Sequence, residues 1–243
     1  MHRTRSAFGS RHGLVLAALA ALAAGLSGCG GSDPGPSANP DEGPLLPFKT
    51  GNSWTYQVTD TGVVTQKTTT IGDLEVIGGT GPNATKMAYN VITRKGTDLA
   101  DQTESWQAPS EESPDRFVRY REISYGATTQ MPKLETYWNP SKLHIDGRAE
   151  LLMDNHNWQE EYEEGKIPFD GTVPTPLTRT KDIWTVIAVD ETVTAAGTEY
   201  QHTVHFRKVS DSGAQKEYWY KPNVGKIKET GTQTEELVDF SLK

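Results

Sequence analysis

Five segments of the chain are rich in β-branched and aromatic residues, and short turn signals lie between them. The segments are Ser53–Thr59, Ala88–Thr93, Phe117–Ile123, Ile183–Val189 and Tyr200–Phe206. The turn signals are Asp60–Gly62, Gly78–Gly79, Lys95–Gly96, Asp146–Gly147, Ala196–Gly197 and Asp211–Gly213. This pattern predicts strands joined by hairpins. Because no stretch sustains a helical period over three turns, we expect an all-β, antiparallel fold with few or no helices.

The start of the chain has the layout of a secretory signal peptide. A basic segment precedes an apolar stretch, Gly13–Leu26, and small residues lead to Leu26-Ser27-Gly28-Cys29, which holds the only cysteine. As a helix the stretch would reach about 21 Å, which is too short for a hydrocarbon core of about 30 Å, so cleavage is expected. The tetrapeptide resembles the lipobox of bacterial lipoproteins, which implies cleavage between Gly28 and Cys29 and acylation of Cys29. The alternative is a plain secreted protein that is cut nearby and keeps a free thiol.

The resemblance to lipoprotein signals also bears on location. It implies a lipid-anchored protein of the cell envelope, held in the membrane by acyl chains such as palmitate on Cys29. Gly30 stands where enterobacterial inner-membrane retention favours aspartate, so the resemblance implies an outer-membrane location.

The remainder of the chain divides into a tether and one domain. Residues 29–45 contain Gly, Pro, Ser and Asp in place of large apolar side chains until Leu45, so a lipidated, disordered tether is expected after the signal peptide of residues 1–28. Residues 46–243 are long enough for one β domain with a substantial core. Removing the signal peptide takes three arginines and no acid, which changes the net charge from −8 to −11. An acidic body repels nucleic acid, so no nucleic-acid partner is expected.

Two segments of this domain align with each other at a shift of 113 residues. Residues 85–109 match residues 198–222 without a gap, and nine of the 25 positions are identical. We interpret this as an internal duplication, with pseudo-repeats at about 46–150 and 151–243.

Each matched segment is expected to be a hairpin that turns near Asp98 or Asp211. The hypothesis is a cross-strand ion pair beside a buried tryptophan in each hairpin. The residues are Arg94, Glu104 and Trp106 in the first and Arg207, Glu217 and Trp219 in the second. Such a set could form two ligand sites, but a hairpin scaffold retained after duplication is the favoured interpretation.

Other candidate chemistry is sparse, and no catalytic residue, cofactor site or metal site is expected. His144, Asp146, Asp154 and His156 could be assembled into a metal site, but a turn separates the two pairs and solvated loop residues are the preferred interpretation. The acidic run Glu160–Glu164 is interpreted as a solvated strand edge.

Two further segments carry a family resemblance. Gly51–Tyr56 at the start of the domain and Tyr218–Glu229 near its end, together with the anchor and tether, resemble bacterial lipoproteins of an uncharacterised family. The body is similar to the half-barrels of outer-membrane lipoprotein carriers, which implies an open, half-barrel-like sheet. The chain departs from those carriers because it shows no clear helices to fill the barrel.

Three functions are therefore considered. The first is a non-enzymatic, membrane-anchored binding or scaffolding domain whose partner is an envelope protein. The second is a carrier of a lipid or another apolar ligand in a concave sheet. The third is an envelope hydrolase, which would need a nucleophile or an acid and base cluster that the sequence does not display.

Overall fold

The computed structural model describes residues 43–96, 101–126 and 131–243. These residues belong to the unit Pro36–Lys243, and the other unit, Met1–Gly35, lies outside them. The signal peptide, Cys29, residues 30–42 of the tether and Asp98 also lie outside the described residues.

The described part of the chain is a succession of β-strands with one short 3-10 turn, Ala149–Leu151, so the all-β expectation is confirmed. The strands are β1 (Ser53–Asp60), β2 (Val63–Val76), β3 (Met87–Gly96), β4 (Asp101–Pro109), β5 (Arg116–Tyr125), β6 (Pro132–Asp146), β7 (Asn157–Pro168), β8 (Thr175–Ala195), β9 (Thr198–Ser210), β10 (Gln215–Lys221), β11 (Gly225–Thr230) and β12 (Thr234–Ser241). Each of the five predicted strand segments lies within one of these strands.

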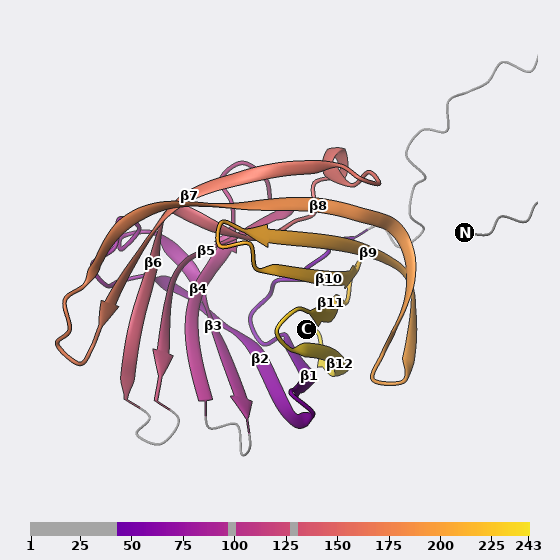
Figure 1. Ribbon diagram of the computed structural model, residues 1–243, viewed down its shortest axis with the longest axis horizontal. Coiled ribbons are helices and arrows are strands. Elements are labelled where there is room, and N and C mark those ends of the chain that lie inside the picture. The colour runs from indigo at the N-terminus through magenta and orange to yellow at the C-terminus, as the bar shows by residue number, and fades with distance from the viewer. Residues whose placement is uncertain (1–42, 97–100, 127–130) are drawn as a thin grey trace, which may run out of the picture. The chain divides into compact units, whose positions relative to one another are not determined.

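The strands form a closed antiparallel barrel in which each strand pairs with its neighbours in sequence. The barrel closes because β12 pairs with β1, from Ser53 opposite Ser241 to Thr59 opposite Thr234. Figure 1 shows the first and last strands side by side. The expected open or half-barrel-like sheet is therefore wrong. Closure gives the backbone groups of both outer strands a partner, which an open sheet would leave free.

The predicted boundary between the two pseudo-repeats lies close to the 3-10 turn, which separates β6 from β7. The two segments that align in the sequence are the hairpins β3–β4 and β9–β10. The duplication itself stays a prediction.

Side chains alternate between the inside and the outside of the barrel wall, as the two-residue period of a strand requires. On β1, Trp54, Tyr56 and Val58 are 2%, 4% and 0% exposed, whereas the residues between them are half-buried. Further along the wall, Trp184, Phe206 and Tyr220 pack edge to face, with ring centroids 6.4 and 6.1 Å apart.

The segment that leads into β1 is part of the barrel's packing. Leu45 and Leu46 are buried, and the Phe48 ring lies 5.4 Å from Tyr89 and 5.0 Å from Phe117. The backbone N–H of Asn223 donates to the carbonyl oxygen of Pro44 over 3.0 Å. The chain is therefore anchored to the barrel before its first strand begins.

Candidate functional site

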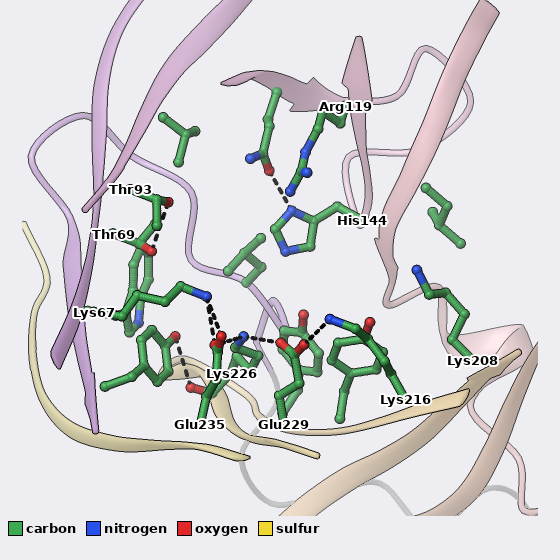
Figure 2. A pocket seen from close by; sticks show the side chains of 18 of the residues that line it. Lys67, Thr69, Thr93, Arg119, His144, Lys208, Lys216, Lys226, Glu229 and Glu235 are labelled. Carbon is green, nitrogen blue, oxygen red and sulfur yellow. Dashed lines mark hydrogen bonds and ion pairs between the residues drawn. The ribbon is translucent and has the colours of Figure 1, made fainter. Parts of the chain in front are cut away.

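The interior of the barrel holds a cavity of about 520 Å³, which is within the usual size of a small-molecule site. Aromatic side chains form part of its wall, including Trp54, Tyr56, Trp184, Tyr218 and Tyr220. Charged side chains form much of the remainder: Lys67, Arg119, Lys142, Lys208, Lys216, Lys226, Glu229 and Glu235. Figure 2 labels these charged groups apart from Lys142 and shows them reaching into one cavity from strands far apart in the sequence.

Five of the charged groups form a continuous chain of alternating sign. Lys67 Nζ lies 2.7 Å from Glu235 Oε2, and Lys226 Nζ lies 2.7 Å from the same oxygen. Lys226 Nζ also lies 2.5 Å from Glu229 Oε2, and Lys216 Nζ lies 2.6 Å from Glu229 Oε1. Figure 2 shows the row Lys67, Glu235, Lys226, Glu229 and Lys216 along one side of the cavity.

A β-bulge puts both charges of β11 into this row. Lys226 and Glu229 are three residues apart, so in a regular strand they would point to opposite faces. Pairing between β10 and β11 shifts register here, since Tyr220 lies opposite Lys226 and Trp219 opposite Lys228. The extra residue, Ile227, returns Glu229 to the side of the wall on which Lys226 lies.

The chain of charges shifts the pKa values of its members. Burial alone would lower the pKa of Lys226, but Glu229 and Glu235 outweigh it and hold that pKa well above its ordinary value. Burial alone would raise the pKa of Glu235, but Lys226 and Lys67 bring it down to about 2, and Lys226 and Lys216 lower the pKa of Glu229 in the same way. These three groups are therefore ionised at neutral pH.

At Lys67 and Lys208 of the cavity, burial outweighs the nearby carboxylates and the pKa is lowered. Burial, and then the charge of Lys226, lowers the pKa of Lys67 to about 8. Burial lowers the pKa of Lys208 to about 8 as well, with Lys142 as the largest of the cations that add to the effect. A positive charge at either position is costly in the folded protein, and a bound anion would relieve that cost.

The cations at the other side of the cavity have their carboxylate partners outside the lining. Arg119 Nη1 lies 2.7 Å from Glu122 Oε2, Lys142 Nζ lies 3.8 Å from Glu164 Oε2, and Lys208 Nζ lies 3.6 Å from Asp182 Oδ2. Among the residues that the structure describes, six cations and two carboxylates line the cavity, and three further carboxylates pair with the cations from behind. The interior is thus net positive in a chain whose net charge is −8.

His144 borders the same cavity from β6. Its side chain is half-buried, and desolvation inside the barrel lowers its pKa well below 6.5, with the nearby charge of Arg119 as the next cause. Its Nδ1 lies 2.5 Å from Gln107 Oε1. His144 is therefore a neutral imidazole at physiological pH.

The tryptophans singled out in the sequence are buried, but they lie on the outer side of the barrel wall. Trp219 is 8% exposed and stands between Tyr218 and Tyr220, which both line the cavity, so it points the other way. Its ring stacks on that of His205, with centroids 4.1 Å apart, and its Nε1 donates to Glu191 Oε2 over 3.2 Å.

Trp106 has a similar position on the first hairpin. It is 6% exposed, and it directly precedes Gln107, which lines the cavity. The guanidinium of Arg121 covers the ring at 4.5 Å from its centroid, and Trp106 Nε1 donates to Glu75 Oε1 over 2.9 Å. Arginine and carboxylate side chains thus cover the tryptophan from outside the barrel.

The expected ion pair forms in only one of the two hairpins. Arg207 lies opposite Glu217, and the two side chains are 2.9 Å apart. Arg94 lies opposite Gln102, to which it donates over 3.3 Å, and Glu104 lies opposite Ile92. The expected pairing of Arg94 with Glu104 is therefore wrong, because the register of the β3–β4 hairpin is two residues shorter than that of β9–β10.

The histidines and acids considered for a metal site are not brought together. Asp146 pairs with Arg148 at 2.7 Å, Asp154 accepts from the Val189 N–H, and His156 stacks on Trp158. Within the described residues, no group of three or more His, Cys, Asp or Glu side chains is placed to hold a metal ion. The prediction of solvated loop residues is wrong for His144 and Asp146, because both lie on β6, His144 beside the cavity and Asp146 fully buried.

The acidic run on β7 is not a solvated edge, because the closed barrel pairs β7 on both sides. Glu160 forms an ion pair with Arg116 at 2.6 Å, and Trp138 Nε1 donates to Glu164 over 2.9 Å.

Sequence reasoning missed the charged interior altogether. One signal was available on β10, where Lys216, Tyr218 and Tyr220 share a face by the period of two and place a lysine on the same side as a half-buried and a buried tyrosine. No such signal exists for Glu229, whose orientation depends on the bulge.

Comparisons with known proteins add little to this geometry. No family model matches the chain, and no curated protein matches it. Among solved structures, the chain is similar to a Bacteroides fragilis protein with a YmcC-like fold that is proposed to be exported, with 10% identity and a TM-score of 0.44. The match covers 82% of this chain and all of that one. Within the described residues, no helix is long and apolar enough to cross a membrane.

Proposed function

We propose that this chain is a lipid-anchored protein of the bacterial cell envelope, with its anchor in the outer membrane, whose barrel binds a small hydrophilic anion without chemically changing it. The observation that carries the proposal is the positively charged cavity inside an acidic protein. Six cationic side chains line it, and two of them, Lys67 and Lys208, are held in environments that oppose their own charge. An anion between them would add its charge to that of Glu235 and Asp182, which already pair with these two lysines.

The same lining argues against a carrier of lipid or another apolar ligand. An acyl chain in this cavity would take water away from lysine and glutamate side chains and give them no polar contact in return. The aromatic residues in the wall leave room for an apolar part of a ligand, but the charged rows require a hydrophilic one. A small hydrophilic anion whose carbon skeleton can pack against the aromatic wall matches both features.

Calorimetric titration of the full chain, extracted from membranes in non-ionic detergent, tests the binding proposal. The probes are gluconate as the anion and glucose as a neutral sugar of similar size. We expect heat of binding for gluconate alone, and a loss of about tenfold or more in affinity in the double variant Lys67→Met/Lys208→Met. Lys228→Met is the matched control, since Lys228 lies outside the cavity lining and pairs with Glu236 at 2.8 Å.

Three outcomes would contradict the binding proposal. The first is equal binding of gluconate by the native chain and the double variant. The second is recovery of phospholipid or fatty acid in stoichiometric amount when the protein is examined by native mass spectrometry, which would support the apolar carrier instead. The third is turnover of an envelope glycan or peptide by the native chain, which would favour a hydrolase.

The anchor is tested separately, with the variant Cys29→Ser. If Cys29 is lipidated, the native chain is found with outer-membrane fractions and carries acyl chains by mass spectrometry, whereas the variant does not. An unmodified cysteine in the mature chain would support the plain secreted alternative. This result leaves the proposal for the cavity untouched.

A further inference from the structure

A relay of hydrogen bonds inside the barrel fixes the orientation of Gln107. Ser105 Oγ lies 3.5 Å from the carbonyl oxygen of Val91, and Gln107 Nε2 donates to Ser105 Oγ over 2.8 Å. The relay continues to His144, whose Nδ1 lies 2.5 Å from Gln107 Oε1. All three of these side chains come from strands that face the cavity, β4 and β6.

The donor and acceptor of each hydrogen bond in the relay follow from its end at Val91. A backbone carbonyl can only accept, so the Ser105 hydroxyl donates to Val91 and accepts from the amide nitrogen of Gln107. The amide oxygen of Gln107 then faces His144, and His144 Nδ1 must carry the proton. Because the imidazole is neutral, the other ring nitrogen, Nε2, has no proton and is an acceptor.

Figure 2 shows the ring of His144 inside the cavity with Arg119 beside it, and the bond to Gln107 engages only the Nδ1 side of the ring. No described residue donates a hydrogen bond to His144 Nε2. The charges that act most strongly on the ring are the cations Arg119 and Lys226. Their repulsion disfavours both a proton and a metal ion on Nε2, which leaves a hydrogen-bond donor as the group that this atom can bind.

We propose that the cavity selects anions that also carry a hydroxyl or N–H group, and that His144 Nε2 accepts a hydrogen bond from that group. The preferred ligand class is then a hydroxylated or amino-bearing acid, such as a sugar acid, which should bind more tightly than a simple carboxylate or an inorganic ion. This inference rests on the proposed binding function. An anion without a donor would displace water from this acceptor and give it no hydrogen bond in return, which lowers affinity by about tenfold or more.

A matched pair of probes separates the donor from the charge. Gluconate and hexanoate are both six-carbon carboxylates, and they differ in the hydroxyl groups that gluconate carries. Titration of the full chain in detergent is expected to give at least tenfold tighter binding for gluconate than for hexanoate. In the variant His144→Asn, whose amide can replace Nδ1 as donor to Gln107 but has no group at Nε2, this ratio is expected to approach one.

The variant His144→Gln is the second test, since its amide oxygen can occupy the place of Nε2 and is expected to retain part of the preference. A preference that survives unchanged in His144→Asn, or a native chain that binds hexanoate as well as gluconate, would overturn the role of His144 and leave anion binding standing. A native chain that binds neither probe would overturn the proposed function and the inference with it.

The protonation of the ring can also be measured without a ligand. Nitrogen-15 NMR of the full chain with labelled histidine distinguishes a protonated ring nitrogen from a bare one. The His144 signal is identified by its absence in His144→Asn, and we expect it to report a proton on Nδ1 and none on Nε2. A proton on Nε2 of His144 at neutral pH would contradict the inference.

Discussion

Lys226 Nζ lies 2.7 Å from Glu235 Oε2 inside the barrel, where the two side chains are 13% and 2% exposed. The same lysine contacts Glu229, so one cation is shared by two buried carboxylates. Because a buried charge is costly without a partner, these contacts tie β11 to β12 from the inside of the wall.

Replacement of Lys226 by methionine should therefore destabilise the fold strongly. Lys67 and Lys216 would still contact the two carboxylates, so we expect a loss of about 3 kcal/mol, the lower end of the range for a broken buried pair. Urea unfolding at pH 7 measures the effect. Lys228→Met breaks a pair in which both side chains are 23% exposed, and it should cost less than about 1 kcal/mol. Equal losses in the two variants would contradict this account of the interior.

The depressed pKa of Lys67 predicts how stability depends on pH. Between pH 8 and about 9.5 the folded protein releases the Lys67 proton, while the unfolded chain keeps it up to pH 10.5. Since the unfolded state binds more protons, stability rises with pH in this window, by at most about 1.4 kcal/mol per pH unit for each such lysine. Above pH 10, buried tyrosines such as Tyr56 oppose the rise, because burial raises their pKa.

Comparison of the native chain with Lys67→Met isolates this contribution. The difference in unfolding free energy between the two, measured in urea at constant ionic strength, should increase in favour of the native chain from pH 8 to 9.5. A difference that stays constant with pH would show that Lys67 keeps an ordinary pKa in the folded protein.

The strand pattern could be predicted because it depends on local sequence. Segments such as Ser53–Thr59 and Phe117–Ile123 carry the β-branched and aromatic residues of a half-buried strand, and glycine-containing turns mark their ends. Barrel closure could not be predicted in this way. It depends on pairing between β1 and β12, and β12 reads Thr-Glu-Glu-Leu-Val-Asp-Phe-Ser, which lacks a regular apolar alternation.

The interior charges escaped prediction for a related reason. Lysine and glutamate are mostly exposed, so Lys226 and Glu229 fit a solvated strand until the barrel closes around them. The bulge at Ile227 then changes which face Glu229 occupies. The relay from His144 to Val91 joins β6, β4 and β3, and no local pattern brings these strands together.

A side chain at position 79 should destabilise the fold, because Gly79 lies against the groups that cover Trp106. A Cβ at this position would lie 2.7 Å from both Arg121 Cζ and Glu135 Oε1, and its φ is +76°. We expect Gly79→Ala to cost about 1 to 3 kcal/mol more than Gly62→Ala, which has a similar φ of +84° and nothing within 4 Å. Thermal unfolding of both variants measures the difference, and similar losses would argue against rigid packing around Arg121.

Trp219 should contribute to stability although it lies on the outer side of the wall. Its ring is 8% exposed and stacks on His205, so Trp219→Ala should cost about 3 to 5 kcal/mol in urea unfolding. Phe240→Ala removes another aromatic ring, which is 40% exposed, and should cost less than about 1 kcal/mol. A loss below about 1 kcal/mol for Trp219→Ala would mean that the stacked ring is not part of the core.

The central claim is that the interior of the barrel binds an anion, and anomalous diffraction tests it most directly. Crystals of the protein soaked in selenate should show an anomalous peak inside the cavity, in contact with Lys67, Lys208 or Arg119, and the peak should be absent from crystals of Lys67→Met/Lys208→Met. Peaks confined to the outer surface, with only water in the cavity of the native protein, would contradict the claim.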